Sequence, residues 1–184
     1  PNGCTAMDTV VVEAEEDTPD LSLSTDTLTC EIDSVQLQSM SSVTSLTYSW
    51  SSPGGFSSTV ANPYTQVADT YTLVVTAPNG CTATRQVSVI EDLTKPGASA
   101  NGGTINCITT SVMLTGGSST PNVTFSWTGP GGFTSNEQNP QVSVPGTYIL
   151  LVTGSNGCTN TAIAEVFDDT TPPLVETGGA VIDC

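Results

Sequence analysis

The sequence predicts an all-β protein composed of tandem β-sandwich repeats of 77 residues. Two observations carry this prediction. The chain repeats itself with an unbroken period, and its apolar residues alternate with polar ones as they do in strands. A third observation is the regular occurrence of glycine, proline and asparagine between these alternating segments, where the chain must turn. No segment has the apolar spacing of a helix.

The cysteines show the period most directly. Asn-Gly-Cys occurs at Cys4, Cys81 and Cys158, and 81 − 4 = 158 − 81 = 77. Other cysteines, aromatic residues and prolines recur at the same offset: Cys30, Cys107 and Cys184; Trp50 and Trp127; Phe56 and Phe133; Tyr71 and Tyr148; Pro19, Pro96 and Pro173. The chain holds about 2.4 repeats (184/77). Because it starts and stops inside a repeat, we expect it to be a window of a longer array.

Prolines after short acidic runs mark the expected domain boundaries. Residues 1–18 are expected to hold the last strand of a preceding repeat, and 173–184 the first strand of a following one. Two complete repeats lie between them, at 19–95 and 96–172. Because proline fixes its own φ and restricts the preceding residue, the linkers should be short and stiff.

Alternation predicts the strands within each module. In the second complete repeat we expect strands near 97–101, 104–107, 111–117, 123–128, 132–135, 141–144, 147–153 and 158–167. About seven short strands with a tryptophan on the third main strand resemble an immunoglobulin-like sandwich. Tyr148, after Pro145-Gly146-Thr147, stands where such a sandwich has its tyrosine corner. We expect Trp50 and Trp127 to be core residues.

Charge excludes some partners. With 18 acidic residues against Arg85 and Lys95, the formal net charge is −16. Such a chain lacks the cations that neutralise phosphate, so nucleic acid and anionic membranes are not expected partners. No stretch of 18 apolar residues and no signal peptide is visible. The expected partners are neighbouring repeats of the same chain, and cations, basic surfaces or neutral sugars.

The six cysteines predict disulfides, because the chain has no histidine and no Cys-x-x-Cys pair to suggest zinc. Three pairings remain open. The first joins cysteines of one sandwich, Cys30 with Cys81 and Cys107 with Cys158, and precedent for two cysteines in each repeat favours it. The second, Cys30 with Cys158, crosses a junction between sandwiches. The third uses the 26-residue spacing and pairs Cys4 with Cys30, Cys81 with Cys107, and Cys158 with Cys184.

The acidic linkers are candidate calcium ligands, because Ca²⁺ prefers carboxylate and carbonyl oxygens. The candidates are Glu15, Asp17, Glu91, Asp92, Asp168 and Asp169. The alternative is a solvated run of charge with no cofactor. No catalytic residues are expected, because without histidine a serine or cysteine has no ordinary base.

Two aromatic residues are candidates for contact between chains. Phe56 and Phe133 each follow Pro-Gly-Gly, on an edge or loop, and they either pack on their own sheet or contact a neighbouring chain. Asn122-Val123-Thr124 matches the N-glycosylation sequon, but only one repeat carries it.

The combination of these motifs resembles a known family. A cysteine before the second strand, Tyr-x-Trp, Gly-Pro-Gly-Gly-Phe, Pro-Gly-Thr-Tyr, Asn-Gly-Cys-Thr and an acidic Thr-x-Pro linker are similar to the Ig-like or PKD-like repeats of giant secreted surface proteins of Bacteroidota. The first repeat departs from this pattern at Ser51-Ser52-Pro53 and at Ala68-Asp69-Thr70-Tyr71. The family comprises adhesins and cell-surface filaments exported by type IX secretion.

The resemblance also implies O-glycosylation, at Asp followed by Ser or Thr and a small or aliphatic residue. The positions that match are Thr9, Thr27, Ser34 and Thr170.

Two functions are compatible with the sequence, and neither is enzymatic. In the first, the repeats form an extracellular shaft or stalk that projects an adhesive tip at the cell surface. Assembly of several chains into a homo-oligomeric filament is a sub-case of this function. In the second, each repeat is an adhesin module with its own site for a ligand such as a polysaccharide. The unbroken 77-residue register favours the first.

Overall fold

The computed structural model describes residues 2–10 and 18–171. The chain divides into two compact units, residues 1–92 and 93–184, and each is a β-sandwich. Within the described residues the only helical segment is one 3-10 turn, Pro130–Gly132. The predicted fold class, tandem immunoglobulin-like sandwiches, is therefore confirmed. Residues 2–10 form no strand.

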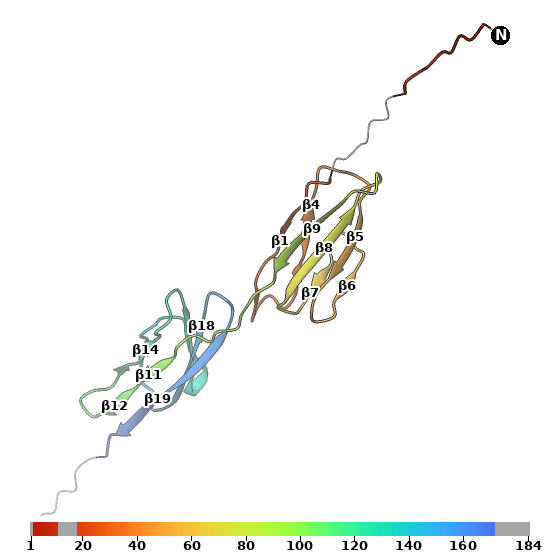
Figure 1. Ribbon diagram of the computed structural model, residues 1–184. Coiled ribbons are helices and arrows are strands. Elements are labelled where there is room, and N and C mark those ends of the chain that lie inside the picture. Colours follow the sequence, from red (N-terminus) through yellow and green to blue (C-terminus); the bar gives the residue numbers. More distant parts are fainter. Residues whose placement is uncertain (1, 11–17, 172–184) are drawn as a thin grey trace, which may run out of the picture. The chain divides into compact units, whose positions relative to one another are not determined.

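The first unit has a four-stranded antiparallel sheet in the order β6 (Ser57–Ser58), β5 (Thr47–Ser51), β8 (Thr70–Thr76) and β9 (Thr82–Ser88) (Figure 1). In the opposing layer β1 (Ser22–Ser24) pairs with β4 (Gln38–Met40), and β3 (Val35–Gln36) pairs with β7 (Tyr64–Thr65). β3 and β4 are two halves of one strand that meet at Leu37. Finally, β2 (Leu28–Thr29) runs parallel to β10 (Glu91–Asp92).

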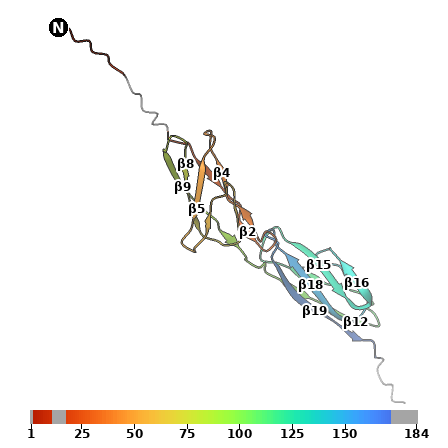
Figure 2. The same cartoon turned by 90° about the vertical axis from the view of Figure 1, so that its right-hand side faces the viewer.

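The second unit repeats this topology. Its larger sheet has the order β12 (Gly103–Asn106), β19 (Thr159–Asp169), β18 (Gly146–Thr153), β15 (Thr124–Gly129) and β16 (Phe133–Ser135), which lie side by side in Figure 2. In the other layer β11 (Ser99–Asn101) pairs with β14 (Thr115–Gly117), and β13 (Val112–Met113) with β17 (Gln141–Val142). The strands expected from alternation differ from these bounds by only a few residues.

The core of each unit lies between its two layers. In β8 the inward residues Tyr71, Leu73 and Val75 are at most 1% exposed, and their equivalents in β18 are buried to the same degree. Trp50 and Trp127 are also fully buried, and the indole N–H of each donates to a backbone carbonyl 3.2 Å away. Both tryptophans are thus core residues, as predicted, because a buried indole needs a hydrogen-bond acceptor.

Each unit has a tyrosine corner. The hydroxyl of Tyr71 donates to the Val67 carbonyl over 2.8 Å, and that of Tyr148 donates to the Val144 carbonyl over 2.7 Å. Antibody domains carry an inter-sheet cysteine two residues after this tyrosine. Here that position is a fully buried leucine, Leu73 in the first unit. Apolar packing therefore replaces the usual disulfide of the sandwich core.

The first repeat closes its corner loop with different residues. Asp69 accepts hydrogen bonds from the backbone N–H of Gly54 (2.9 Å) and of Thr70 (2.7 Å), and from the Ser52 hydroxyl. These hydrogen bonds lower the pKa of the Asp69 carboxyl, and the bond from the Ser52 hydroxyl contributes most. In the second repeat Gly146, with φ at +137°, stands in its place. Ser52 and Asp69, which both depart from the repeat pattern, are thus hydrogen-bonded to each other.

Candidate functional site

The Asn-Gly-Cys cysteines follow identical hairpin turns. In the first unit the Gly80 N–H donates to the Ala77 carbonyl over 2.9 Å, and the Cys81 N–H donates to Asn79 Oδ1 over 3.0 Å. The equivalent bonds before Cys158 measure 3.0 and 3.1 Å. Glycine is required in both turns because its φ is positive, at +86° and +74°. The two turns therefore place their cysteines in the same local conformation.

The other cysteine of each repeat follows the strand that runs parallel to the last one. Cys30 comes directly after β2, where Thr29 is in register with Asp92. Cys107 comes directly after β12, where Asn106 is in register with Asp169. These cysteines thus lie at the end of the module from which the chain leaves.

The oxidation states exclude two of the three predicted pairings. Cys30 and Cys158 are each disulfide-bonded, whereas Cys4, Cys81 and Cys107 carry free thiols. Neither Cys30–Cys81 nor Cys107–Cys158 therefore forms, so the pairing within one sandwich is wrong. The pairing by 26-residue spacing fails as well, because it needs Cys4, Cys81 and Cys107. Cys184 lies outside the described residues.

The reason is the length of the last strand. Cys158 directly precedes β19, and Cys107 lies beside its far end, with Sγ 3.6 Å from the Thr170 carbonyl oxygen. A strand of eleven residues spans about 35 Å. Bridged Cα atoms must lie within about 7 Å of each other. The two cysteines of one sandwich are thus at opposite ends and cannot meet.

The predicted calcium ligands are not gathered into a site within the described residues. Glu91 and Asp92 form β10, Asp168 and Asp169 end β19, and all four are exposed. In residues 2–10 and 18–171 no three acidic or cysteine side chains come close enough to hold a metal ion. Glu15 and Asp17 lie outside the described residues. Calcium binding stays a prediction of the sequence.

Phe56 and Phe133 pack within their own modules. Phe56 meets Tyr71 edge to face with ring centroids 5.1 Å apart, and Phe133 meets Tyr148 in the same way at 5.4 Å. Such edge-to-face pairs stabilise by about 0.5–1.5 kcal/mol beyond the burial of their surface. Both phenylalanines remain half-exposed. A contact of these exposed parts with another chain stays a prediction.

A shallow hollow lies beside each of these phenylalanines, and its lining is repeated only in part: Phe56 and Val67 of the first hollow recur as Phe133 and Val144 in the second. In the first unit it is lined by Tyr64, Thr65 and Gln66 among others, all polar at their tips. The residues 77 positions later, in the second hollow, are Gln141, Val142 and Ser143. The order of polar and apolar groups thus changes from one module to the next.

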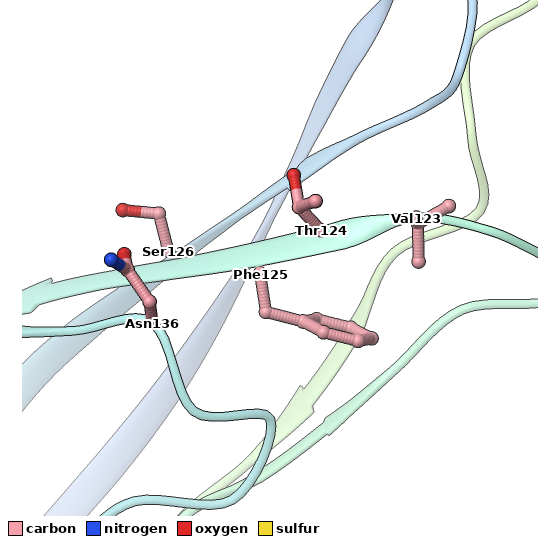
Figure 3. A pocket seen from close by; sticks show the side chains of 5 residues that line it. All are labelled: Val123, Thr124, Phe125, Ser126 and Asn136. Atoms are coloured by element: carbon pink, nitrogen blue, oxygen red, sulfur yellow. The ribbon is translucent and has the colours of Figure 1, made fainter.

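A third hollow, of about 500 Å³, lies on β15 of the second unit. Figure 3 shows Thr124 and Ser126 pointing to one side of the strand and Phe125 to the other. Val123 and Asn136 complete the lining, which has no charged side chain. Asn122, the asparagine of the sequon, precedes it on an exposed turn with φ at +55°.

All four predicted O-glycosylation residues lie outside strands. Thr9 and Thr170 are exposed, and Thr27 and Ser34 are half-buried. Loop positions are open to a modifying enzyme, so the geometry is compatible with glycans, whose presence stays a prediction. In the described residues no helix is long and apolar enough to cross a lipid bilayer.

Comparison with known proteins supports the fold. No family model and no curated protein matches the sequence. Among solved structures, the Ca²⁺-stabilized adhesin with which an Antarctic bacterium binds ice aligns with a TM-score of 0.52 and 16% identity, over 85% of this chain and 50% of that one.

Other solved structures align with lower scores. The fibronectin(III)-like modules of CbhA from Clostridium thermocellum align with a TM-score of 0.37 and 8% identity, over 86% of this chain and 100% of that one. The SGBP-B protein of Bacteroides ovatus, solved with a mixed-linkage heptasaccharide, aligns at 0.34 and 13%, over 82% and 47%. The structural neighbours are thus extracellular immunoglobulin-like and fibronectin(III)-like modules and adhesins.

Proposed function

We propose that this chain is a segment of the shaft of a long extracellular repeat protein, which carries an adhesive tip away from the cell surface. The neighbouring modules are joined by short linkers, and each is stabilised by its own packed core. Disulfide-bonded Cys30 and Cys158 favour an oxidising, extracellular setting. The aligned Ca²⁺-stabilized adhesin, which helps an Antarctic bacterium reach out and bind ice, has the same fold over the aligned half of its chain.

One observation carries this proposal: the two modules repeat the contacts that stabilise the fold, but not the polar groups of residues 64–66 that line the first hollow. The tryptophan hydrogen bond, the tyrosine corner and the phenylalanine–tyrosine pair occur in both units. Between the two hollows, residues 64–66 (Tyr, Thr and Gln) are replaced by residues 141–143 (Gln, Val and Ser). Recognition of one ligand needs the same polar groups at the same places. Repeats that serve as spacers need only the same fold.

The alternative is a ligand site in each module, and the two functions differ in what removal of repeats should do. In cells that carry the parent protein, deletion of residues 19–172 removes two whole periods (2 × 77 = 154 residues) and leaves the register intact. A shaft predicts a shorter surface fibre in electron micrographs, with unchanged adhesion once contact is made. Repeated ligand sites predict adhesion that falls in proportion to the number of repeats.

A competition experiment separates the two functions independently. The purified 184-residue chain, added in excess, should leave adhesion of the intact cells unchanged if the repeats are spacers. Dose-dependent inhibition of adhesion by this chain would refute the proposed function and favour the ligand-binding alternative.

A further inference from the structure

The outer face of the larger sheet in the second unit has an exposed apolar centre. In β18 the buried Leu150 points into the core, so its neighbours Ile149 and Leu151 point outward, with 44% and 37% of their surfaces exposed. In β19 the outward row contains Ile163, which is 61% exposed. Ile149 and Ile163 are directly opposite each other in the antiparallel register. The three aliphatic side chains therefore form one patch across the two strands.

Small hydroxyl side chains surround this patch. On β15, which lies beside β18 in Figure 2, Ser126 is in register with Leu151 and Thr128 with Ile149. On β19, Thr161 is opposite Leu151. An apolar centre with little charge inside a polar rim is the usual arrangement of a protein–protein interface.

The fold does not need isoleucine at these positions. The equivalents of Ile149 and Ile163 in the first unit, 77 residues earlier, are Thr72 and Gln86, which are also directly opposite each other. There the Gln86 side-chain amide donates to the Thr72 hydroxyl over 3.0 Å. One repeat thus has a hydrogen-bonded polar pair where the other exposes two isoleucines. Because apolar surface gains free energy when it leaves water, covering the isoleucine pair is favourable.

Charge indicates which partner can cover the face. Residues 93–171 contain one basic and four acidic side chains, a formal charge of −3 (1 − 4), whereas residues 18–92 have a charge of −6 (1 − 7). Within segments 124–129, 146–153 and 159–167, the outer face has one charged side chain, Glu165. Both oxygens of its carboxylate accept a hydrogen bond from the Thr147 hydroxyl, at 3.0 and 3.1 Å.

This scarcity of charge favours a second copy of the chain over a basic partner. A basic surface would find one carboxylate to pair with on this face, and that carboxylate is already hydrogen-bonded. Two copies of the face, in contrast, match each other: aliphatic side chains meet aliphatic side chains, and hydroxyls meet hydroxyls. They also bring two acidic chains together where repulsion is weakest.

The size of the face determines how strong such a contact can be. Neighbouring strands are about 4.8 Å apart, and the eight residues of β18 extend about 27 Å, so β15, β18 and β19 present about 390 Å². A standard interface buries about 800 Å² on each partner. The face supplies about half of this area, so two isolated chains should pair weakly.

We propose that the outer face of β15, β18 and β19 in the second unit pairs with the same face of a second copy of this chain. The two sheets pack face to face at about 10 Å, with their strands within about 30° of each other. Because the same patch serves both copies, the contact is two-fold symmetric and closes as a dimer. The pairing does not depend on the shaft function proposed above. In a longer array, each further module with this face would strengthen it.

Sedimentation equilibrium of the purified 184-residue chain tests the pairing. The free thiols are alkylated first, so that no disulfides form between chains. From about 10 μM to about 1 mM, the average mass should rise from the 18.8 kDa of the monomer toward twice this value. Association should strengthen with salt, because salt screens the repulsion between acidic chains. A monomer at every concentration, or association that weakens with salt, would overturn the proposal.

The first unit supplies the variant that tests the apolar centre. Ile149→Thr together with Ile163→Gln gives the second unit the polar pair of the first, and should lower the association constant by about tenfold or more. The control is Ile108→Gln, which removes a 93% exposed isoleucine of the same unit away from this face. It should leave association unchanged. The urea midpoint of each variant shows that the second unit is folded. Unchanged association in the double variant, or an equal loss in the control, would refute the contact.

NMR spectra recorded over the same concentrations locate the contact. Backbone amide signals of β15, β18 and β19 should shift as the dimer forms. Those of β5, β8 and β9, the equivalent strands of the first unit, should stay in place. Shifts of equal size in both units, or shifts confined to other strands, would contradict the assignment of this face.

Discussion

The two tyrosine corners offer an internal comparison, because they differ in one hydrogen bond. Tyr148 donates to the Val144 carbonyl, and residue 142 beside it is a valine. Tyr71 donates to the Val67 carbonyl and also shares a hydrogen bond of 2.5 Å with the buried Thr65 hydroxyl. Removing the tyrosine hydroxyl therefore breaks two hydrogen bonds in the first unit and one in the second.

The magnitudes follow from this count. A neutral hydrogen bond contributes about 1 kcal/mol to stability, and more when its loss leaves a buried partner unsatisfied. We expect Tyr148→Phe to lower the free energy of unfolding of its unit by about 1 kcal/mol and Tyr71→Phe by about 2 kcal/mol. In a Thr65→Val background, which gives the first unit the residue of the second, the cost of Tyr71→Phe should fall to about 1 kcal/mol.

The assay must report on each unit separately, and the two buried tryptophans allow this. The indole N–H groups of Trp50 and Trp127 each donate to a carbonyl of their own unit, and we expect each to give its own NMR signal. Urea titrations that follow these signals yield one unfolding curve for each unit. Equal costs for the two tyrosine variants, or a Tyr71→Phe cost that Thr65→Val does not change, would refute the reasoning.

The same two signals test three further predictions. Hydrogen bonds from Ser42 and Ser41, chiefly the one from the Ser42 N–H, lower the pKa of Asp20. Hydrogen bonds from Ser52, Gly54 and Thr70 lower the pKa of Asp69. Because the equivalent residues of the second unit are glycines, acid titration below about pH 3.8 should lower the urea midpoint of the first unit preferentially, and Asp20→Asn with Asp69→Asn should remove the difference. Burial raises the pKa of Tyr148 above 10.0, so ionisation of this tyrosine should not affect the stability of the second unit below pH 10 and should lower it above pH 10. Tyr148→Phe should abolish this fall, and a fall that persists in the variant would exclude Tyr148 as its cause. Gly102→Ala should destabilise the second unit by several kcal/mol, because its Cβ would lie 1.9 Å from the Glu165 carbonyl oxygen, whereas Thr25→Ala at the equivalent position should have little effect.

The fold was accessible from the sequence because each of its determinants is local or periodic. Alternating apolar residues give the strands, and the turns before Cys81 and Cys158 need glycine at positive φ. The tryptophans and the tyrosine corners were recognised because their order along the chain is that of an immunoglobulin-like sandwich.

The disulfide pairing was not accessible in the same way. Precedent for two cysteines in each repeat favours a bond within one sandwich, and the wrong pairing rests on that precedent. The signal against it was present: Cys107 precedes the second main strand at one end of the module, and Cys158 follows the hairpin at the other. Sequence alone does not show at which end of the module Cys30 lies, because this depends on the parallel register of β2 with β10.

The hydrogen bonds of the linker were also missed. Asn156 and Asn160 look like ordinary turn and strand residues, but their side chains hold the Thr94 and Pro96 carbonyls. Asn79 and Asn156 recur with the period, as parts of Asn-Gly-Cys. Position 83, the equivalent of Asn160, is alanine, so this second contact is not repeated.

Stretching a single array of several repeats tests the account most directly. With every disulfide reduced, each module should unfold in one discrete step that releases its 77 residues, about 280 Å at 3.6 Å per residue. A smooth extension without steps, or steps that span two repeats at once, would contradict independent modules that bear load.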